Sequence, residues 1–292
     1  MSVTNPVGQA AVAAVRPRRF LTLRTAVKSP AFIIGLLIVA FWVACALWGR
    51  SIAPKDAFAD YIKTGYPRRA KPGGRFLMGT DDLGRDVWSR VIVGSHDILT
   101  IAPLATALGT VLGTILGLVT GYYRRWVDLV VSRIIDAFLA IPLLLLALVV
   151  ITARGSSTST VIIVIGVAFA PIIARTVRSA VLAQADLDYV QAARLRGERG
   201  YYVMFREILP NVLGPILVEF TVRLGYAIFS VVTLSFLGVG VQDPSADWGL
   251  AVSKYYAGLN PFWWPVVFPC LAIASLVVAV NLVADALQEA QS

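Results

Sequence analysis

Six long apolar runs, separated by shorter polar stretches, organise this chain. They cover approximately residues 31–48, 98–122, 127–151, 161–182, 212–237 and 264–282. Each run is about as long as a helix that crosses the hydrocarbon core of a bilayer, which takes roughly 17 to 25 residues. The polar connectors leave no room for a soluble domain of ordinary size. The pattern therefore predicts an all-α membrane protein with six transmembrane helices.

The charges ahead of the first apolar run indicate the topology. Residues 1–30 are polar to mixed and hold five Lys or Arg residues. Cytoplasmic segments are enriched in these residues, so we expect the segment 1–30 to be cytoplasmic. A cleaved signal peptide would also begin with positive charge, but the run 31–48 is long for one and no good small-x-small cleavage site follows it. An uncleaved first helix and six spans place both ends of the chain in the cytoplasm.

The first run and the polar stretch after it, residues 31–97, form a predicted unit of one transmembrane helix and one extracytoplasmic loop. The loop, residues 50–97, is broken by prolines and by a pair of adjacent glycines, and it holds nine Lys or Arg residues. So many positive charges conflict with an external position. Residues 98–292 then form a core of five transmembrane helices, with a cytoplasmic loop at 183–210.

The second run carries glycines at strict four-residue intervals: Gly109, Gly113, Gly117 and Gly121. Residues four apart stack along one side of a helix, so these glycines form a shallow groove that admits a neighbouring helix closely. We interpret the four positions as a helix-packing seam.

Two carboxylates lie within predicted spans. Asp136 has Arg133 one turn before it, and Glu219 has Arg223 four residues after it. An unpaired charge at the bilayer centre costs about 2.5–3.5 kcal/mol on insertion scales, so we expect each acid to pair with its neighbouring arginine. Whether such pairs are structural, or line a polar pathway, is left open by the sequence.

Composition limits the chemistry. The chain is 58% hydrophobic and 15% charged, and its net charge of +9 lies mostly between apolar runs, where positive residues set topology and meet anionic lipid rather than nucleic acid. One histidine, His96, provides too little for His-based metal sites or for Ser-His and Cys-His catalysis. Cys45 and Cys270 give no disulfide or metal motif. The chain has no G-x-x-x-x-G-K-[ST] phosphate loop, so we expect no metal or cofactor in it, and its energy to come from a gradient or a partner.

The tryptophans and tyrosines after the fifth run are candidates for contact with the lipid headgroups. Trp248, Tyr255, Tyr256, Trp263 and Trp264 fall in or next to the loop 238–261. Such amphipathic rings are enriched at the headgroup level, which is where we expect them.

The polar stretch 186–210 interrupts two apolar runs. Asp186 or Asp188 is suited to cap a helix, Gly197 to end it in a left-handed turn, and Pro210 to stop a second helical segment over 201–209. This predicts a surface hairpin of two short helices. Its small residues, Ala192 and Ala193, permit the close approach of another protein.

The hairpin resembles the cytoplasmic loop of binding-protein-dependent ABC importer permeases. That pattern is Glu-Ala-Ala, three residues, Gly, nine residues, Ile, one residue and Leu-Pro. The chain matches it with Gln191-Ala192-Ala193, Gly197 and Leu209-Pro210, and it departs with Gln191 for Glu and Glu207 for Ile.

Three further segments are similar to the C-type permease subunit of dipeptide, oligopeptide and nickel importers. They are residues 79–86, residues 235–242 leading to Trp248-Gly249, and residues 281–283 with Asp285 and Leu287. Departures are Asp243 and Ala246 at common proline positions, Ala284 for Gly and Gln288 for Arg.

This resemblance implies a six-helix permease fold in a bacterial inner membrane, with no ATPase site of its own. It also implies a second homologous permease subunit, ATPase subunits that bind ATP and Mg, an extracytoplasmic substrate-binding protein and a peptide substrate. The residues implied to couple to the ATPase are Gln191, Ala192, Ala193, Gly197, Glu207, Leu209 and Pro210. The alternative cargo is nickel or another non-peptide solute. Two alternatives belong to other functional classes: an intramembrane hydrolase built on Asp136 and Glu219, and an independent secondary transporter.

Overall fold

The computed structural model describes residues 29–289, so the predicted cytoplasmic segment 1–30 lies almost wholly outside the described residues. Within the described range the chain is helical and contains no β-strand. The helices are α2 (Pro30–Ile52), α3 (Tyr61–Thr64), α4 (Val87–Tyr123), α5 (Arg125–Leu139), α6 (Leu143–Arg154), α7 (Thr158–Ala185), α8 (Asp188–Leu195), α9 (Gly200–Tyr202), a π-helical segment (Val203–Ile208), α10 (Leu209–Phe236), α11 (Trp248–Tyr255), a 3₁₀ turn (Tyr256–Gly258) and α12 (Trp264–Glu289).

Five helices in the described range are long and apolar enough to cross a membrane: α2, α4, α7, the continuous helix 200–236 and α12. The third predicted span, 127–151, is not one straight helix, because α5 and α6 meet at an angle of 83°. Pro142 lies at this break. Proline lacks an N–H and disfavours helical backbone in the residue before it, so the helix ends ahead of Pro142 and restarts after it. The pair supplies a sixth crossing only if both halves together count as one span.

Helix α4 begins at Val87 rather than at Ile98, so the predicted boundary between residues 97 and 98 falls inside a helix. Asp86 caps this helix, its carboxylate accepting a hydrogen bond from Ser89 N at 3.0 Å. The first three turns are polar enough to resemble a loop, yet Val91 is buried against the core. Burial of these turns against neighbouring segments explains why hydropathy alone misplaces the start.

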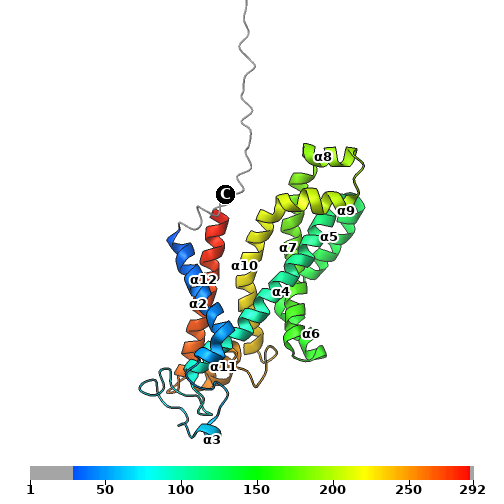
Figure 1. Cartoon of the computed structure of the whole chain (residues 1–292). Coiled ribbons are helices and arrows are strands. Elements are labelled where there is room, and N and C mark those ends of the chain that lie inside the picture. Colours follow the sequence, from blue (N-terminus) through cyan, green and yellow to red (C-terminus); the bar gives the residue numbers. More distant parts are fainter. Residues whose placement is uncertain (1–28, 290–292) are drawn as a thin grey trace, which may run out of the picture.

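The molecule has two ends along its long axis (Figure 1). One end carries α8 and is named the hairpin end; the other carries α3, α11 and the loop 53–86, and is named the loop end. Helix α2 begins and α12 ends at the hairpin end (Figure 1). The described part of the chain therefore starts and finishes on the same side, as six crossings require.

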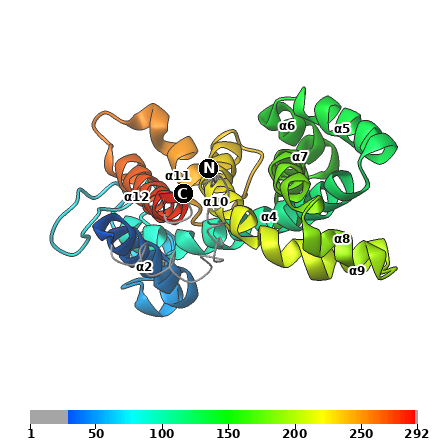
Figure 2. The same cartoon turned by 90° about the horizontal axis from the view of Figure 1, so that it is seen from above.

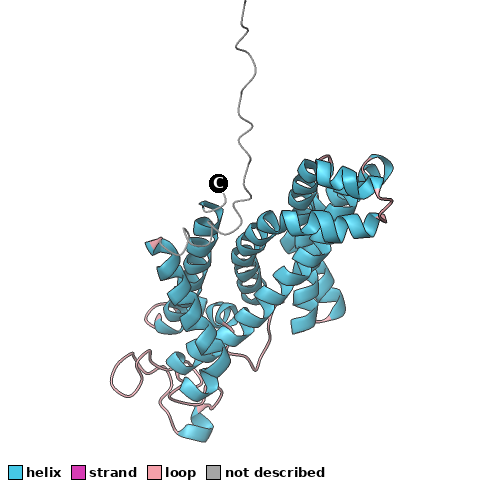
Figure 3. Cartoon of the chain, turned by 45° about the horizontal axis from the view of Figure 1, so that its top comes forward, coloured by secondary structure: helices cyan, strands magenta, loops and turns pink. Residues whose placement is uncertain are grey.

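Helix α4 connects two groups of helices. Seen from above, α2 and α12 lie on one side, α5, α6 and α7 on the other, and α10 between them, with α4 crossing beneath (Figure 2). Contacts of α4 with α2, α7 and α10 agree with this arrangement. Helices fill almost the whole body, and the loops gather at its ends (Figure 3).

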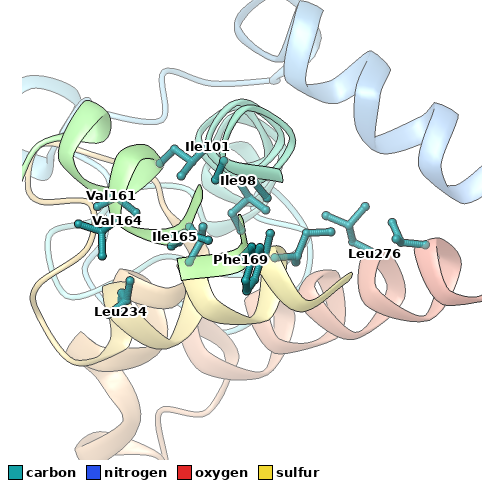
Figure 4. Close-up of a cluster of buried hydrophobic side chains, with 14 of the residues drawn as sticks. Ile98, Ile101, Val161, Val164, Ile165, Phe169, Leu234 and Leu276 are labelled. Atoms are coloured by element: carbon teal, nitrogen blue, oxygen red, sulfur yellow. The ribbon is translucent and has the colours of Figure 1, made fainter. Parts of the chain in front are cut away.

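The apolar core forms where α4, α7, α10 and α12 meet (Figure 4). Ile98 and Ile101 of α4 lie against Ile165 and Phe169 of α7, and all four side chains are buried. Because lipid is as apolar as these side chains, close packing rather than exclusion of water holds such helices together. The core therefore fixes the positions of the helices that carry the polar groups.

Candidate functional site

The hairpin (residues 186–210) starts without the cap that the sequence predicts. Leu187 occupies the N-cap position of α8, and no side chain caps it. Asp186 instead ends α7 and accepts a hydrogen bond from Arg124 Nη2 at 2.8 Å, while Asp188 lies in the first turn of α8. The carbonyl of Leu187 accepts hydrogen bonds from the N–H groups of Val190 and Gln191, which are the first bonds of α8, and the leucine side chain has no acceptor that could cap the helix.

The two faces of α8 differ. Val190 and Ala193 are buried in the core, whereas Gln191 and Ala192 are exposed. The expectation that both alanines face another protein is therefore wrong for Ala193, which anchors the hairpin to its own chain. Ala192 remains available for a close external contact.

The tip of the hairpin is formed by Gly197. Its φ is +77°, in the left-handed region that favours glycine, and no atom lies within 4 Å of where its Cβ would be. Gly197 N bonds to Arg194 O and Glu198 N to Ala193 O, which satisfies carbonyls at the end of α8. Leu195, beside the tip, is 89% exposed. The hairpin thus projects an apolar side chain and an open glycine outward.

Pro210 does not stop the second half of the hairpin. The helix runs without interruption from Gly200 to Phe236, and Pro210 lies in the first turn of α10. The six residues before α10 are π-helical, and Leu209 N bonds to Met204 O, one residue further back than in an α-helix. Proline has no N–H to donate inside a helix, and the π-helical bonding before α10 widens the turn that precedes Pro210. The π-helical segment thus lets the chain continue through Pro210.

Two residues at motif positions make contacts inside the hairpin and its attachment. Glu207, at the usual Ile position, pairs with Arg196 at 3.4 Å across the hairpin. Leu209 is partly buried against the core, and Pro210 is exposed. Glu207 thus links the two arms of the hairpin, and Leu209 joins the second arm to the core.

The end of α4 also contacts the hairpin. The guanidinium of Arg194 lies over the ring of Tyr122 at 4.8 Å, and a Cβ on Gly200 would meet the hydroxyl of Tyr123 at 2.7 Å. The hairpin is thus connected directly to α4, α7 and α10, three of the five long helices.

The structure places the four-residue glycine series along the contact between α4 and α7. A Cβ at Gly109 would lie 2.8 Å from Gly166 O, one at Gly113 2.7 Å from the Cβ of Ile173, and ones at Gly117 and Gly121 2.6 Å from Val177 and Val181 side chains. Real Cβ atoms do not come so close, so only glycine permits this helix separation. Gly166 of α7 faces back toward Ala105 and Leu108 in the same way.

The charged residues of the spans pair differently from the prediction in one case. Glu219 and Arg223 do pair, with Nε to Oε1 at 2.6 Å. Asp136, however, pairs with Arg175 of α7 and not with Arg133, which is exposed and makes no ion pair within the described range. Helix packing brings Arg175 of α7 within hydrogen-bonding distance of Asp136, and this pairing takes precedence over the neighbour one turn away on α5.

A second ion pair joins the same two helices. Arg178 donates to both carboxylate oxygens of Asp128, each at 2.5 Å. Asp128 and Asp136 of α5 thus each pair with an arginine of α7.

A polar network at the loop end was not predicted. Arg85 Nε binds Asp81 Oδ2 at 2.6 Å, and the hydroxyl of Tyr255 lies 3.1 Å from the same oxygen. Arg90 donates to the carbonyls of Ser245 at 2.7 Å and of Ala57 at 3.2 Å. These contacts join the loop 53–86, the start of α4 and α11 into one unit. The segment 79–86, noted for its resemblance to a permease signature, provides two members of the network.

The aromatic residues after α10 are mostly buried inside the protein. Trp248 is fully buried and donates from Nε1 to Val91 O at 2.9 Å; Trp264 donates to Thr80 O at 2.9 Å. Burial also raises the pKa of the Tyr255 hydroxyl. Only Tyr256 and Trp263 of this set are exposed. The loop end folds into a polar and aromatic cap, so local hydropathy gives no indication of their burial.

Asp247 belongs to this cap and precedes α11. Its Oδ1 accepts a hydrogen bond from Leu250 N at 2.8 Å, which caps the helix. Burial raises the pKa of its carboxyl to about 6, and the nearby Asp97 carboxylate adds to this. No group of three or more His, Cys, Asp or Glu residues able to hold a metal ion occurs among residues 29–289.

A known protein family and several known proteins match this chain. The family described as binding-protein-dependent transport system inner membrane component matches residues 113–292. The dipeptide transport system permease protein DppC of Alkalihalophilus pseudofirmus is 33% identical over 264 residues, covering 90% of this chain and 86% of that protein. The di/tripeptide transport system permease protein DppC of Pseudomonas aeruginosa is 36% identical and covers 88% and 86%. The glutathione transport system permease protein GsiD of Escherichia coli is 37% identical and covers 94% and 88%.

Solved structures share the fold. The inward-facing MetNI methionine ABC transporter matches with a TM-score of 0.55 and 21% identity, over 69% of this chain and 95% of that chain. An amino acid ABC transporter matches with a TM-score of 0.51 and 17% identity, over 67% and 91%. The chain therefore belongs to the family of inner-membrane components of binding-protein-dependent transport systems, and it is a multi-pass permease subunit of an ABC importer.

Proposed function

We propose that the chain forms half of a translocation pathway for di- and oligopeptides, the other half being a second, homologous permease subunit. The names of relatives support a peptide cargo, since the three described above are named for dipeptides, di- and tripeptides, and glutathione. None of these names favours nickel. ATP and Mg bind to partner ATPase subunits, and a substrate-binding protein delivers the peptide at the loop end.

The hairpin is the proposed contact with an ATPase subunit, at the cytoplasmic face. The observation that carries this is the division of α8 into a buried anchoring face and an exposed face. Gln191, Ala192, Leu195 and Gly197 project from the hairpin end, while Val190 and Ala193 fix α8 to the core. A rigid projection that rests on α4, α7 and α10 transmits a push from outside into the spans.

Access to the pathway then follows the state of the ATPase. A partner biases an equilibrium only through contacts that differ between the two states of the permease. The hairpin supplies those contacts, and its junction with α7 and α10 passes the movement to the helices that carry Arg175, Glu219 and Arg223.

Two substitutions on the exposed face test this contact. Gly197→Asp has open space for its side chain but strains the left-handed backbone of the tip, and Ala192→Arg adds a long charged group to an exposed position, so both changes act on the hairpin and not on the core. We expect both variants to remain in the membrane, to lose co-purification of the ATPase subunit, and to lose peptide uptake by reconstituted vesicles.

A matched control is Ala183→Arg, which adds the same side chain at an exposed position on the last turns of α7. It should keep uptake and ATPase binding near the wild-type level. Wild-type uptake by Gly197→Asp or Ala192→Arg would overturn the proposed contact.

A further inference from the structure

Polar groups of α7 and α10 meet inside both helices, with Thr176 about two-thirds of the way along α7 and Arg223 at the middle of α10. Thr176 Oγ1 donates to Glu219 Oε2 at 3.3 Å, and Glu219 Oε1 accepts from Arg223 Nε at 2.6 Å. Arg223 is 14 residues after Leu209 and 13 before Phe236, the two ends of α10. At 1.5 Å per residue this is about 20 Å from either end. The ion pair is therefore at the middle of the span, the most expensive position for a charge.

A second pair lies at the same level. Arg175, next to Thr176 in sequence, pairs with Asp136, and the two side chains are 58% and 53% exposed. Charges at this depth are not left facing lipid, because the hydrocarbon offers them no hydrogen-bond partner. In the assembled importer this exposed side must meet water or another polar group.

The donors of Arg223 are only partly used. Its Nε binds Glu219, but no residue in the range 29–289 accepts a hydrogen bond from either terminal nitrogen. These two nitrogens form a fork that matches a carboxylate. Tyr226, on the next turn, lies with its ring 5.3 Å from the guanidinium carbon and is 57% exposed, so it borders the same site.

The two ion pairs, Asp136 with Arg175 and Glu219 with Arg223, contain equal numbers of negative and positive side chains. Each of the two pairs has one positive and one negative member, so the site carries no net charge. Asp136 Oδ2 accepts no hydrogen bond from any described residue, which leaves an acceptor for an ammonium group. A peptide with free termini carries one charge of each sign, whereas a divalent cation would gain no net attraction here.

We propose that these residues form a station for zwitterionic peptides within the pathway, in which Arg223 binds the terminal carboxylate and Asp136 the terminal ammonium. This inference rests on the proposed peptide transport and identifies the residues that touch the cargo. Glu219 and Thr176 are positioning residues, since they hold the guanidinium of Arg223 at the junction of α7 and α10. The charge pairs make the station selective for the peptide backbone termini and tolerant of side chains.

Direct contact is tested by cross-linking in the complete complex. A photoreactive benzoylphenylalanine replaces Tyr226, and the reconstituted importer turns over ATP with its binding protein and a radiolabelled dipeptide. We expect label on this subunit only during turnover. The control is the same replacement at Leu217, which is 59% exposed but lies about 120° around α10 from Arg223. Equal labelling at both positions, or none at Tyr226, would refute the contact.

The charge requirement is tested by uptake and ATP hydrolysis together. Arg223→Gln should lower peptide uptake at least tenfold, while hydrolysis stimulated by the loaded binding protein stays within twofold of wild type. The exchanged pair, Glu219→Arg with Arg223→Glu, keeps an ion pair with reversed direction and should also fail in uptake. Lys254→Gln, which breaks an ion pair with Asp243 at the loop end, is the control and should transport normally.

Three outcomes contradict the station. Normal uptake by the exchanged pair means that the ion pair is only structural. A parallel loss of hydrolysis and uptake places the residues in coupling rather than in cargo contact. Dissociation of the two permease subunits in Arg223→Gln places them in the subunit interface. Failure of the proposed function is distinct, since then the wild-type complex itself does not take up peptide.

Discussion

Arg124 Nη2 donates to Asp186 Oδ2 at 2.8 Å, which ties the turn after α4 to the first residue of the hairpin. The turn is strained, because Arg124 and Arg125 have φ values of +51° and +46°, in the left-handed region. The hydrogen bond from Arg124 also lowers the pKa of the Asp186 carboxyl. A contact between residues 62 positions apart thus helps to set the start of the hairpin.

This contact predicts an effect on coupling rather than on stability. Asp186→Asn removes one charge of an exposed pair, and exposed pairs contribute little to folding, so the melting temperature should hardly change. We expect ATP hydrolysis stimulated by the binding protein to fall about two- to fivefold, because the hairpin is less firmly oriented. Asp188→Asn, an equally exposed change that breaks no ion pair, is the control. An unchanged hydrolysis rate in Asp186→Asn would count against the role of the contact.

The seam between α4 and α7 predicts a strong dependence on glycine. A Cβ at Gly113 would lie 2.7 Å from the Cβ of Ile173 and 2.8 Å from Ala170 O, both on the rigid body of α7. Overpacking of this kind costs about 1–3 kcal/mol, so Gly113→Ala should melt at a clearly lower temperature in detergent. Gly258→Ala, where a Cβ meets nothing within 4 Å, should melt like wild type. Equal melting of the two variants would show that the helices can separate without cost.

The buried indole at the loop end predicts a second loss of stability. Trp248 is fully buried, and its indole N–H donates to Val91 O. Trp248→Ala therefore leaves a large cavity in the cap. Truncation of a buried tryptophan costs about 3–5 kcal/mol, and the fraction of folded protein after mild heating should fall accordingly. Trp263, which is 43% exposed, provides the comparison: its alanine variant should lose far less.

Asp247 predicts how stability depends on pH. Its carboxyl has a pKa of about 6 when folded, against an ordinary value of 3.8, because burial disfavours the charged form. Between these two values the folded protein holds a proton that the unfolded chain releases. This contribution to stability is therefore complete below about pH 4 and is lost as the pH rises through 6.

The measurement is the melting temperature of the purified protein from pH 4 to pH 8. Asp247→Asn keeps the helix cap but cannot ionise, so it should flatten the curve and melt above wild type at pH 7. Asp243→Asn, at an exposed position in the same loop, should leave the shape of the curve unchanged. A wild-type curve that rises between pH 4 and 6 would contradict the assignment.

Several elements follow from the sequence because their causes are local. The long helices α2, α7 and α12 coincide with apolar runs, since a membrane span must satisfy its own backbone hydrogen bonds and present apolar side chains. Gly197 adopts a left-handed conformation where the motif requires one, and Glu219 and Arg223 pair because four residues bring them to one face of a helix.

Other features could not be predicted because their causes are distant in sequence. Pro210 reads locally as a stop, yet the π-helical segment before it lets the helix continue. The early start of α4 and the burial of Trp248 both depend on the cap at the loop end, which is formed by segments more than 150 residues apart. Hydropathy averages over such segments and contains no information about which of them meet.

The sequence by itself determined the approximate place of the five long apolar helices, the hairpin motif and the glycine face, because each arises from residues within a few turns of one another. Only the tertiary structure decided that Asp136 pairs with Arg175 rather than with Arg133, and that Ala193 is buried while Ala192 is exposed. The physical reason is that a charge inside a membrane takes the partner that helix packing brings within hydrogen-bonding distance, and packing is set by the whole chain.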